Sequence, residues 1–244
     1  MKNWAGKRYW LVGASEGLGR ALAQEMSAAG AELVLSARNT ERLAVLAASL
    51  PGPASVVAVD IADHDSVQAA AQAAGDLDGV VFLAGVYWPM ASQNWQAVQA
   101  ETMADINFTG AVRVMGAVVP AMVARGRGHL VLTGSLAGFR GLPGAIGYGA
   151  SKAGVMALAE SMHCDLRATG VQVQLVNPGF IRTRLTAQND FAMPFIMEPD
   201  AAAQVMFAHM NTRRFSCSFP RVFSWVFRGA QFLPDWLYYR LYSK

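Results

Sequence analysis

A glycine-rich turn directly after the first apolar segment is the feature that most constrains the fold. Residues 9–12 (YWLV) form a short apolar run, residues 13–19 (GASEGLG) follow it, and a helical pattern begins at once. Strand, glycine turn and helix in this order are typical of a loop that binds a pyrophosphate. Glycine lets the backbone approach the phosphates, and the helix N-terminus offers free N–H groups and a favourable dipole. We therefore expect a phosphate-binding turn near the start of the chain.

The rest of the chain alternates short apolar runs with helical patterns. Strands are predicted at 9–12, 32–36, 55–59, 79–83, 129–133 and 172–176, and helices near 18–29, 40–49, 64–74, 95–123 and 148–168. This alternation predicts an α/β fold, a single-domain doubly wound (Rossmann-like) mostly parallel sheet with helices on both faces. Ligands of such sheets bind beyond the carboxyl ends of the strands. One rim of the sheet should therefore gather the residues that follow strand ends, namely Gly13, Asp60, Ala84, Ser135 and Pro178.

Tyr148 and Lys152 share one face of the predicted helix 148–168, because they are four residues apart. A free phenol has a pKa of about 10. A fixed ammonium favours the phenolate, so we expect Lys152 to lower the pKa of Tyr148. A tyrosine tuned in this way can pass a proton to or from a carbonyl oxygen, and the Ser135 hydroxyl can hydrogen-bond that oxygen. These residues predict a site that interconverts carbonyls and alcohols and that needs a hydride carrier.

The set resembles the Ser-Tyr-x-x-x-Lys motif of the classical short-chain dehydrogenase/reductase family, and the resemblance covers roughly residues 5–185. The family's catalytic asparagine matches Asn107, which lies in a helical pattern although asparagine is a poor helix former. The resemblance implies that Asn107 bends the helix and holds a water that relays protons to Lys152. It also implies that Lys152 holds the nicotinamide ribose hydroxyls.

The glycine turn resembles the family motif Thr-Gly-x-x-x-Gly-x-Gly, with Val12 in the threonine place. The family's Asn-Asn-Ala-Gly motif survives only as Ala-Gly, and Leu83 replaces an asparagine that ties neighbouring strands together, so packing there should differ. The resemblance implies that Asp60 contacts the adenine, and the alternative for this residue is an Asx turn or helix cap. The candidate cofactor residues are Gly13, Ser15, Gly17, Leu18, Gly19, Arg38, Asp60, Ile61, Ala84, Gly85, Tyr148, Lys152, Pro178, Gly179, Ile181 and Thr183.

Arg38 bears on the type of cofactor. NAD sites usually place an acid about 20 residues past the glycine turn, but residues 33–40 contain none. Arg38 stands near that place, and an arginine can bind a 2′-phosphate through charge-assisted hydrogen bonds. NADP(H) is therefore favoured over NAD(H), although Glu16 in the glycine turn opposes a nearby phosphate. The alternative for Arg38 is an exposed residue at the start of the second helix.

The composition bears on partners and location. Charged residues make up 15% of the chain, below the roughly 25% of typical soluble domains, so we expect surface hidden in oligomer contacts or against lipid. The resemblance implies a homodimer or homotetramer formed through the helices that hold Asn107 and Tyr148. Two cysteines form no disulfide framework, so we expect a cytoplasmic protein in which Cys164 is a buried small residue. We expect no signal peptide, membrane-spanning helix or metal site.

The C-terminal part of the chain, residues 186–244, departs from the family pattern. We divide one domain into a dinucleotide-binding and catalytic core, residues 1–185, and a substrate loop with an aromatic, basic extension, residues 186–244. The Asp-Gly-Gly ending of many family members is absent. From Asn211 onward six basic residues and one acid give +5, against −2 for the remainder. Packing on the protein's own core, a substrate lid or a subunit contact are together the favoured interpretations, and peripheral contact with a membrane interface is the alternative. Nucleic acid is not expected, since nothing else in the chain is strongly basic.

The sequence thus predicts an NADP(H)-dependent oxidoreductase that interconverts a carbonyl and an alcohol on an apolar substrate. In the family a loop at 180–197 covers the substrate. Its apolar residues are Phe191, Met193, Phe195, Ile196 and Met197, with Trp88 and Phe139 as further candidates. A 3-oxoacyl-carrier reductase is one alternative, disfavoured by the missing Asp-Gly-Gly. A non-catalytic NADP(H)-binding regulator or scaffold is the other, and the intact Asn107, Ser135, Tyr148 and Lys152 set argues against it.

Overall fold

Seven parallel strands form the centre of the molecule in the computed structural model, which describes residues 2–242. They are β1 (Arg8–Val12), β2 (Glu32–Ala37), β3 (Ala54–Ala58), β4 (Gly79–Phe82), β5 (Gly128–Thr133), β6 (Val171–Pro178) and β7 (Ser216–Phe219), in the order β3-β2-β1-β4-β5-β6-β7. The central strands β1, β4 and β5 are almost wholly buried. Their sequences are continuous apolar runs because helices cover both faces of the sheet.

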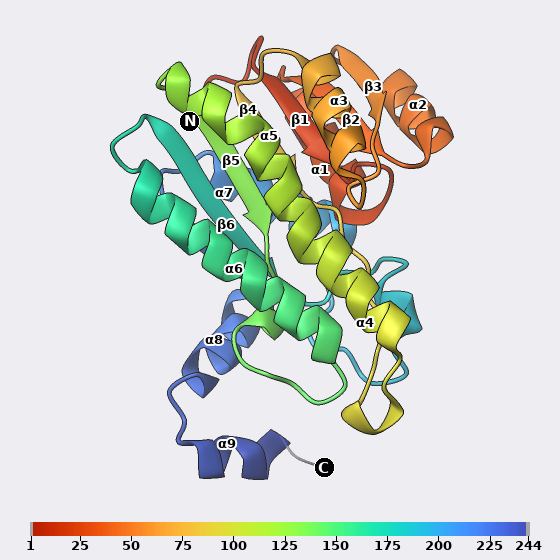
Figure 1. Ribbon diagram of the computed structural model, residues 1–244, viewed down its shortest axis with the longest axis vertical. Coiled ribbons are helices and arrows are strands. Elements are labelled where there is room, and N and C mark those ends of the chain that lie inside the picture. The colour runs from red at the N-terminus through yellow and green to blue at the C-terminus, as the bar shows by residue number, and fades with distance from the viewer. Residues whose placement is uncertain (1, 243–244) are drawn as a thin grey trace.

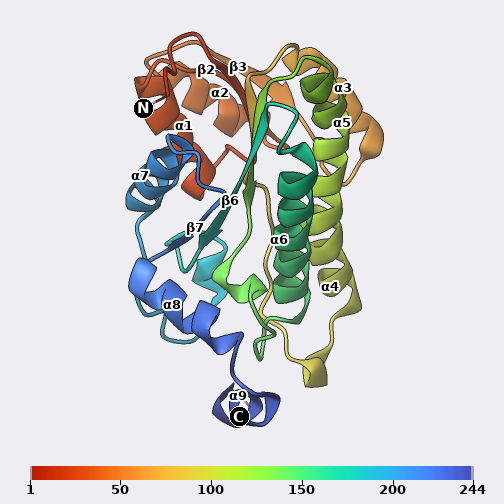
Figure 2. The same ribbon diagram turned by 90° about the vertical axis from the view of Figure 1, so that its left-hand side faces the viewer.

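The helices divide into two layers. Figure 2 shows α1 (Gly17–Ala28), α2 (Thr40–Ser49) and α7 (Pro199–Met210) on one side of the sheet. On the other side lie α3 (His64–Ala74), α4 (Ala97–Ala104), α5 (Gly110–Ala124) and α6 (Ile146–Leu166). Each layer packs its own apolar core against the sheet, with Trp10 and Phe82 facing one layer and Leu11 and Leu35 facing the other. The predicted doubly wound α/β fold is confirmed.

Two elements differ from the sequence-based prediction. The strand β7 was not predicted, because its sequence SCSF is short and half polar. It pairs in parallel with β6, so a last strand forms without the Asp-Gly-Gly ending. The predicted helix 95–123 is in fact α4 and α5 joined by a π-helical turn, η2 (Asp105–Thr109). In addition, Cys164 is exposed on α6, so the expectation that it is buried was wrong.

One helical stretch of the described chain, Ala97–Ala124, is long and apolar enough to cross a membrane by length and composition, although no such helix was expected. It comprises α4, η2 and α5. Its side chains Met103, Val114 and Val118 are buried, and the last two pack against the sheet in the core. Core helices of α/β folds meet the same criteria of length and composition. We therefore interpret this stretch as a core helix.

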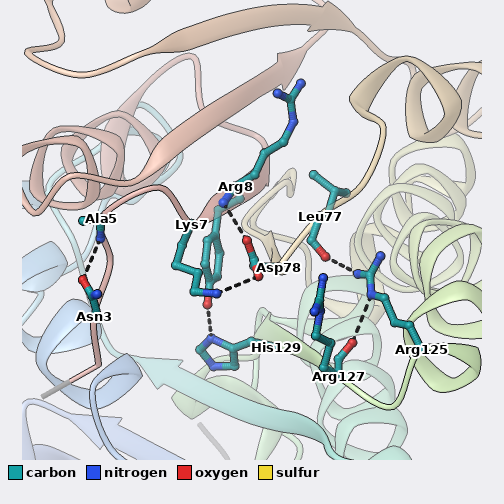
Figure 3. A network of polar contacts seen from close by, with 10 residues as sticks. Asn3, Ala5, Lys7, Arg8, Leu77, Asp78, Arg125, Arg127 and His129 are labelled. Carbon is teal, nitrogen blue, oxygen red and sulfur yellow. Dashed lines mark hydrogen bonds and ion pairs between the residues drawn. The ribbon is translucent and has the colours of Figure 1, made fainter.

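A polar network closes the amino-terminal end of the sheet, opposite the ends where ligands bind (Figure 3). Asp78 accepts hydrogen bonds from the backbone N–H of Arg8 at 3.0 Å and from Lys7 Nζ at 3.1 Å. The buried His129 ring contacts the Tyr9 hydroxyl at 2.9 Å and Gln174 Oε1 at 2.7 Å. These contacts hold the amino-terminal ends of β1, β5 and β6 together.

The last two helices, α8 (Arg221–Ala230) and α9 (Asp235–Tyr242), lie beyond the carboxyl ends of the strands, at the bottom of Figure 1. Arg140, in the loop after β5, holds them there. It donates hydrogen bonds to the backbone oxygens of Ala230 at 2.9 Å and Leu233 at 2.7 Å, and it pairs with Asp235 at 2.6 Å. Its guanidinium also lies 3.9 Å from the ring centroid of the buried Tyr238. The C-terminal segment is therefore fixed to the body of the protein.

Candidate active site

The helix α6 carries Tyr148 and Lys152 in its first turns, over the carboxyl end of β5. Lys152 is buried, and its Nζ donates a hydrogen bond to the backbone oxygen of Thr133, the last residue of β5, at 2.9 Å. Its Nζ lies 5.8 Å from the centroid of the Tyr148 ring. Ser135 lies two residues beyond β5, where extended backbone begins the 3₁₀ turn η3 (Leu136–Gly138), and its Oγ accepts from Ala137 N at 3.2 Å. The structure thus brings the three residues together.

The pKa of Tyr148 moves in the direction opposite to the one expected. Burial raises the pKa of its phenol, and a hydrogen bond with Ser135 only partly opposes this shift. Burial also lowers the pKa of Lys152 to about 8. The apolar surroundings disfavour both charged forms, and Lys152 is not among the groups that lower the pKa of Tyr148. The phenol of Tyr148 is therefore protonated at neutral pH.

Asn107 lies in the π-helical turn η2 and is fully buried. Its side-chain amide is saturated: Oδ1 accepts from Val86 N at 2.8 Å, and Nδ2 donates to Val86 O and to Ser151 Oγ, both at 3.0 Å. A Cβ atom added to Gly85 would lie 3.2 Å from Asn107 Oδ1 and 3.6 Å from Lys152 Nζ. The surviving Ala-Gly pair after β4 therefore leaves room for both side chains. Ser151 was not predicted, although it neighbours Lys152 in the sequence.

A cavity of about 420 Å³ opens along the carboxyl ends of the strands. Ligand pockets typically measure about 300–1,000 Å³. All of the predicted cofactor residues line this cavity: Gly13, Ser15, Gly17, Leu18, Gly19, Arg38, Asp60, Ile61, Ala84, Gly85, Tyr148, Lys152, Pro178, Gly179, Ile181 and Thr183. Tyr148 and Lys152 thus share one cavity with the glycine turn, whereas Ser135 and Asn107 are not among the residues that line it.

The glycine turn fits a pyrophosphate. Gly13 has a φ of 97°, and a Cβ atom there would lie 2.5 Å from the backbone nitrogen of Ala84. A Cβ atom at Gly19 would collide with the backbone oxygen of Gly13. The helix α1 begins at Gly17, and its N-cap residue Glu16 makes no side-chain capping hydrogen bond. The first N–H groups of α1 are therefore free to bind an anion at the wall of the cavity.

Charged side chains gather at the end of the cavity next to β2 and α2. Arg38 is exposed, lines the cavity and forms no ion pair within the described residues. Glu16 pairs with Arg42 at 2.8 Å and with Arg184 at 2.7 Å. Sequence reasoning did not single out these two arginines, although Arg42 follows Arg38 by one helical turn. They neutralise the carboxylate that seemed to oppose a phosphate here.

Asp60 forms the Asx turn that was one of its two predicted interpretations, and the adenine contact stays a prediction. Its Oδ1 accepts a hydrogen bond from Ala62 N at 3.0 Å, which is the Asx-turn arrangement, and the residue also lines the cavity. Leu83 stands in the place of the family's asparagine, lines the cavity and packs with the core on the α1 side. The packing at this strand end is therefore apolar.

Aromatic residues lie beside Tyr148 and between the loop after β6 and α8. The ring of Tyr87 meets that of Tyr148 edge-on, at a centroid distance of 5.0 Å. Phe180 contacts Phe191 and Phe223 at 5.9 Å, and Phe195 contacts Phe223 at 5.5 Å. The loop therefore packs on α8 through aromatic rings. Of the predicted apolar residues, Phe191 and Phe195 are exposed, whereas those at least half-buried are Trp88, Phe139, Met193, Ile196 and Met197.

Tyr87 was not predicted to lie at the site. Its signal in the sequence is its place two residues after Gly85, in the segment that follows β4. In the part of the chain that the structure describes, no three His, Cys, Asp or Glu side chains are placed to hold a metal ion.

Comparison with known proteins gives the family. Residues 7–192 match the family model for short chain dehydrogenases. A Myxococcus xanthus protein described as an uncharacterized oxidoreductase is 38% identical over 237 residues, which cover 93% of each chain. The fold and the site define a nicotinamide-dependent oxidoreductase, and the chain belongs to the short-chain dehydrogenase/reductase family.

Two solved structures bear on the cofactor. A short-chain dehydrogenase from Sphingobium yanoikuyae in complex with NADPH has a TM-score of 0.82 and 27% identity, covering 88% of each chain. A family member from Burkholderia phymatum in complex with NAD has a TM-score of 0.86 and 24% identity, covering 93% of this chain and 94% of that one. Relatives with this fold thus bind either nicotinamide cofactor.

Proposed function

We propose that the protein is an NADP(H)-dependent oxidoreductase that interconverts a carbonyl and an alcohol on an apolar substrate. One observation carries this proposal: Tyr148 and Lys152 line the same cavity as the glycine turn and Arg38. A proton donor, a phosphate-binding turn and an unpaired cation therefore face one ligand-sized space. When bound there, the nicotinamide supplies or accepts the hydride.

The chain's own groups handle the proton. Burial raises the pKa of Tyr148, so its phenol stays protonated at neutral pH and can donate to a carbonyl oxygen that is being reduced. Ser135, which hydrogen-bonds the phenol, stabilises the negative charge that develops on that oxygen. Lys152 has a pKa of about 8, so it is mostly charged at neutral pH and stabilises the phenolate after transfer. Its bond to Thr133 O holds the ammonium in place.

The preference for NADP(H) rests on Arg38. It is exposed and lines the cavity, and Glu16 is already paired with Arg42 and Arg184. A 2′-phosphate next to α2 would therefore meet an available guanidinium rather than an unpaired carboxylate. The comparisons do not favour either cofactor, since the Sphingobium relative binds NADPH and the Burkholderia neighbour binds NAD.

The substrate class follows from the aromatic wall. Tyr87 lies against Tyr148, and the loop that follows β6 packs through Phe180 and Phe195 on Phe223 of α8. These rings favour a ring-type or lipid-like carbonyl compound. Because β7 forms without an Asp-Gly-Gly ending, the absence of that motif no longer argues against a 3-oxoacyl-carrier reductase, and 3-oxoacyl thioesters belong in the substrate panel.

The test is NADPH and NADH oxidation by the purified protein with ketones, aldehydes and 3-oxoacyl thioesters. Tyr148→Phe is expected to lower turnover by about a hundredfold or more, because it removes the general acid. NADPH binding, followed by fluorescence, should remain close to wild type. The exposed Tyr239→Phe is the matched control and should keep full activity. Loss of binding together with turnover would contradict the role of Tyr148, and tight binding without any turnover would favour the regulator.

A further inference from the structure

The outer face of α8 is apolar, although it faces solvent. Val222, Trp225 and Val226 are all exposed, and their spacing of three and four residues places them on one side of the helix. The opposite side carries Phe223 and Phe227, whose rings lie 4.9 Å apart and pack towards the substrate loop. A surface helix normally turns a polar side to water. This helix instead has apolar groups on both sides.

The segment after α8, including α9, exposes further apolar side chains. We define the tail face as seven residues with exposed fractions between 53% and 87%: Val222, Trp225, Val226, Phe232, Trp236, Tyr239 and Leu241. They lie within twenty residues of sequence and make up half of the fourteen large hydrophobic side chains that the described chain exposes. Single exposed apolar residues are normal, but a concentration of this kind marks an interaction site.

The tail face is held in one orientation. Arg140 binds the backbone at Ala230 and Leu233 between the two helices. The Tyr238 hydroxyl donates to Gly141 O at 2.6 Å, and Gln231 Nε2 donates to Phe139 O at 2.9 Å. The segment is thus bonded to the loop that follows Ser135, so the tail face is part of a fixed surface.

Its charge indicates the partner. Arg221 and Arg228 are exposed and lie two helical turns apart on one flank of the apolar stripe of α8. The helix α9 carries a third exposed arginine, Arg240. The acid of this segment, Asp235, is paired with Arg140. In a contact between two copies about a two-fold axis, the same basic patch would face itself. Anionic lipid headgroups complement these arginines instead.

We propose that the tail face docks on the surface of an anionic lipid bilayer. Trp225, Trp236 and Tyr239 are the side chains that favour the boundary between headgroups and acyl chains. Arg221 and Arg228 would lie at the level of the phosphates. The inner side of α8 contacts the substrate loop, so a docked bilayer would lie beside the entrance for an apolar substrate. This last consequence rests on the proposed function, whereas the docking does not.

The experiment is sedimentation of the full-length protein with vesicles of phosphatidylcholine, alone or mixed with phosphatidylglycerol. We expect binding to the mixed vesicles that weakens at high salt, because screening removes the attraction of the arginines. Trp225→Ser combined with Trp236→Ser should weaken binding by more than about tenfold. The matched control is Trp95→Ser, which removes a tryptophan that is 55% exposed outside the tail face and should bind normally.

The charge is tested in the same way. Arg221→Glu with Arg228→Glu should reduce binding by more than about tenfold. Arg127→Glu with Arg167→Glu is the control, since these exposed arginines lie at the opposite end of the sheet and change the net charge equally. NADPH binding, measured without vesicles, shows that each variant is folded and tests the proposed function separately.

Equal loss in the control variants, or no binding to the mixed vesicles, would overturn the proposal. So would a change of oligomeric state, without lipid, in the tail-face variants alone, because the tail face would then contact a second copy of the chain. Undiminished binding by both tail-face variants would overturn it as well.

Discussion

Arg38 is the residue on which the choice between the two nicotinamide cofactors depends. It lies between β2 and α2, is exposed, and lines the cavity. Arg38→Ala is expected to weaken NADPH binding by about tenfold or more, since hydrogen bonds to a charged group contribute about 1.5–3 kcal/mol. NADH binding should change little, because it has no 2′-phosphate. Fluorescence titration with both cofactors is the measurement, and equal losses would show that Arg38 has another role.

The buried amine of Lys152 should make the stability of the folded protein depend on pH in the alkaline range. Burial lowers the pKa of its amine from 10.5 to about 8. Between these values the unfolded chain binds a proton that the folded chain does not, so stability should rise with pH, by up to about 1.4 kcal/mol per pH unit. Lys152→Met should flatten this rise in denaturant unfolding measured at several pH values. Lys2 has the same direction of shift, so part of the slope should remain. Identical slopes would show that Lys152 is not desolvated.

At the scale of single residues, the sequence predicted which side chains lie close together, but it did not predict the direction of their pKa shifts. Four residues of spacing within a helix suffice to place Tyr148 and Lys152 together. The pKa of Tyr148 depends on burial by elements far apart in the chain, and helical spacing does not reveal burial. The pairing of Glu16 with Arg184 also joins residues far apart, so it became visible only in the structure.

Among the elements, the strands with continuous apolar runs were predicted within about two residues at each end, because both faces of the sheet are covered. The exception is β7 at the edge of the sheet, which lies between α7 and α8 and is short and half polar. The π-helical turn that turns Asn107 inward interrupts a helix whose apolar pattern continues across it. Periodicity predicts such a helix as a single unit, and the turn was indicated by the poor helix propensity of asparagine and by the family resemblance.

His129 in β5 allows a test of the polar network at the amino-terminal end of the sheet. Burial lowers the pKa of His129 from 6.5 to about 3. Below pH 6.5 the unfolded chain binds a proton that the folded chain does not, so stability should fall with acid, by up to about 1.4 kcal/mol per pH unit.

The measurement is urea unfolding between neutral pH and pH 5, with His129→Gln for comparison. The variant should show a shallower dependence on pH even if it is less stable throughout. Some slope should remain, because burial lowers the pKa of His209 as well. A slope unchanged by the substitution would show that His129 takes up its proton in the folded protein.

At the scale of the whole molecule, one large apolar surface belongs neither to the sheet, nor to the cavity, nor to the tail face. It lies on the helical stretch Ala97–Ala124. An 18-residue window of the stretch Ala97–Ala124 has a mean hydropathy of 1.5, yet only 39% of that window is buried. Val98, Val112 and Val123 are exposed along it. Family members are typically oligomeric, and burying this surface against a second copy would account for the low content of charged residues. We therefore expect a homodimer or homotetramer formed through α4, α5 and α6.

Light scattering coupled to size exclusion tests this expectation directly. The wild-type protein should have a mass that is a multiple of 26.1 kDa. Val112→Arg, which places a charge on α5, should shift the mass towards the monomer, because an unpaired charge in an apolar interface is strongly unfavourable. The control is Val45→Arg on α2, where the side chain is 68% exposed and lies in the other helical layer. A monomeric wild type would refute the interface, and dissociation by both variants would show that added charge alone is responsible. Since the tail face lies on separate helices, an oligomer built through α5 would leave it free to bind lipid.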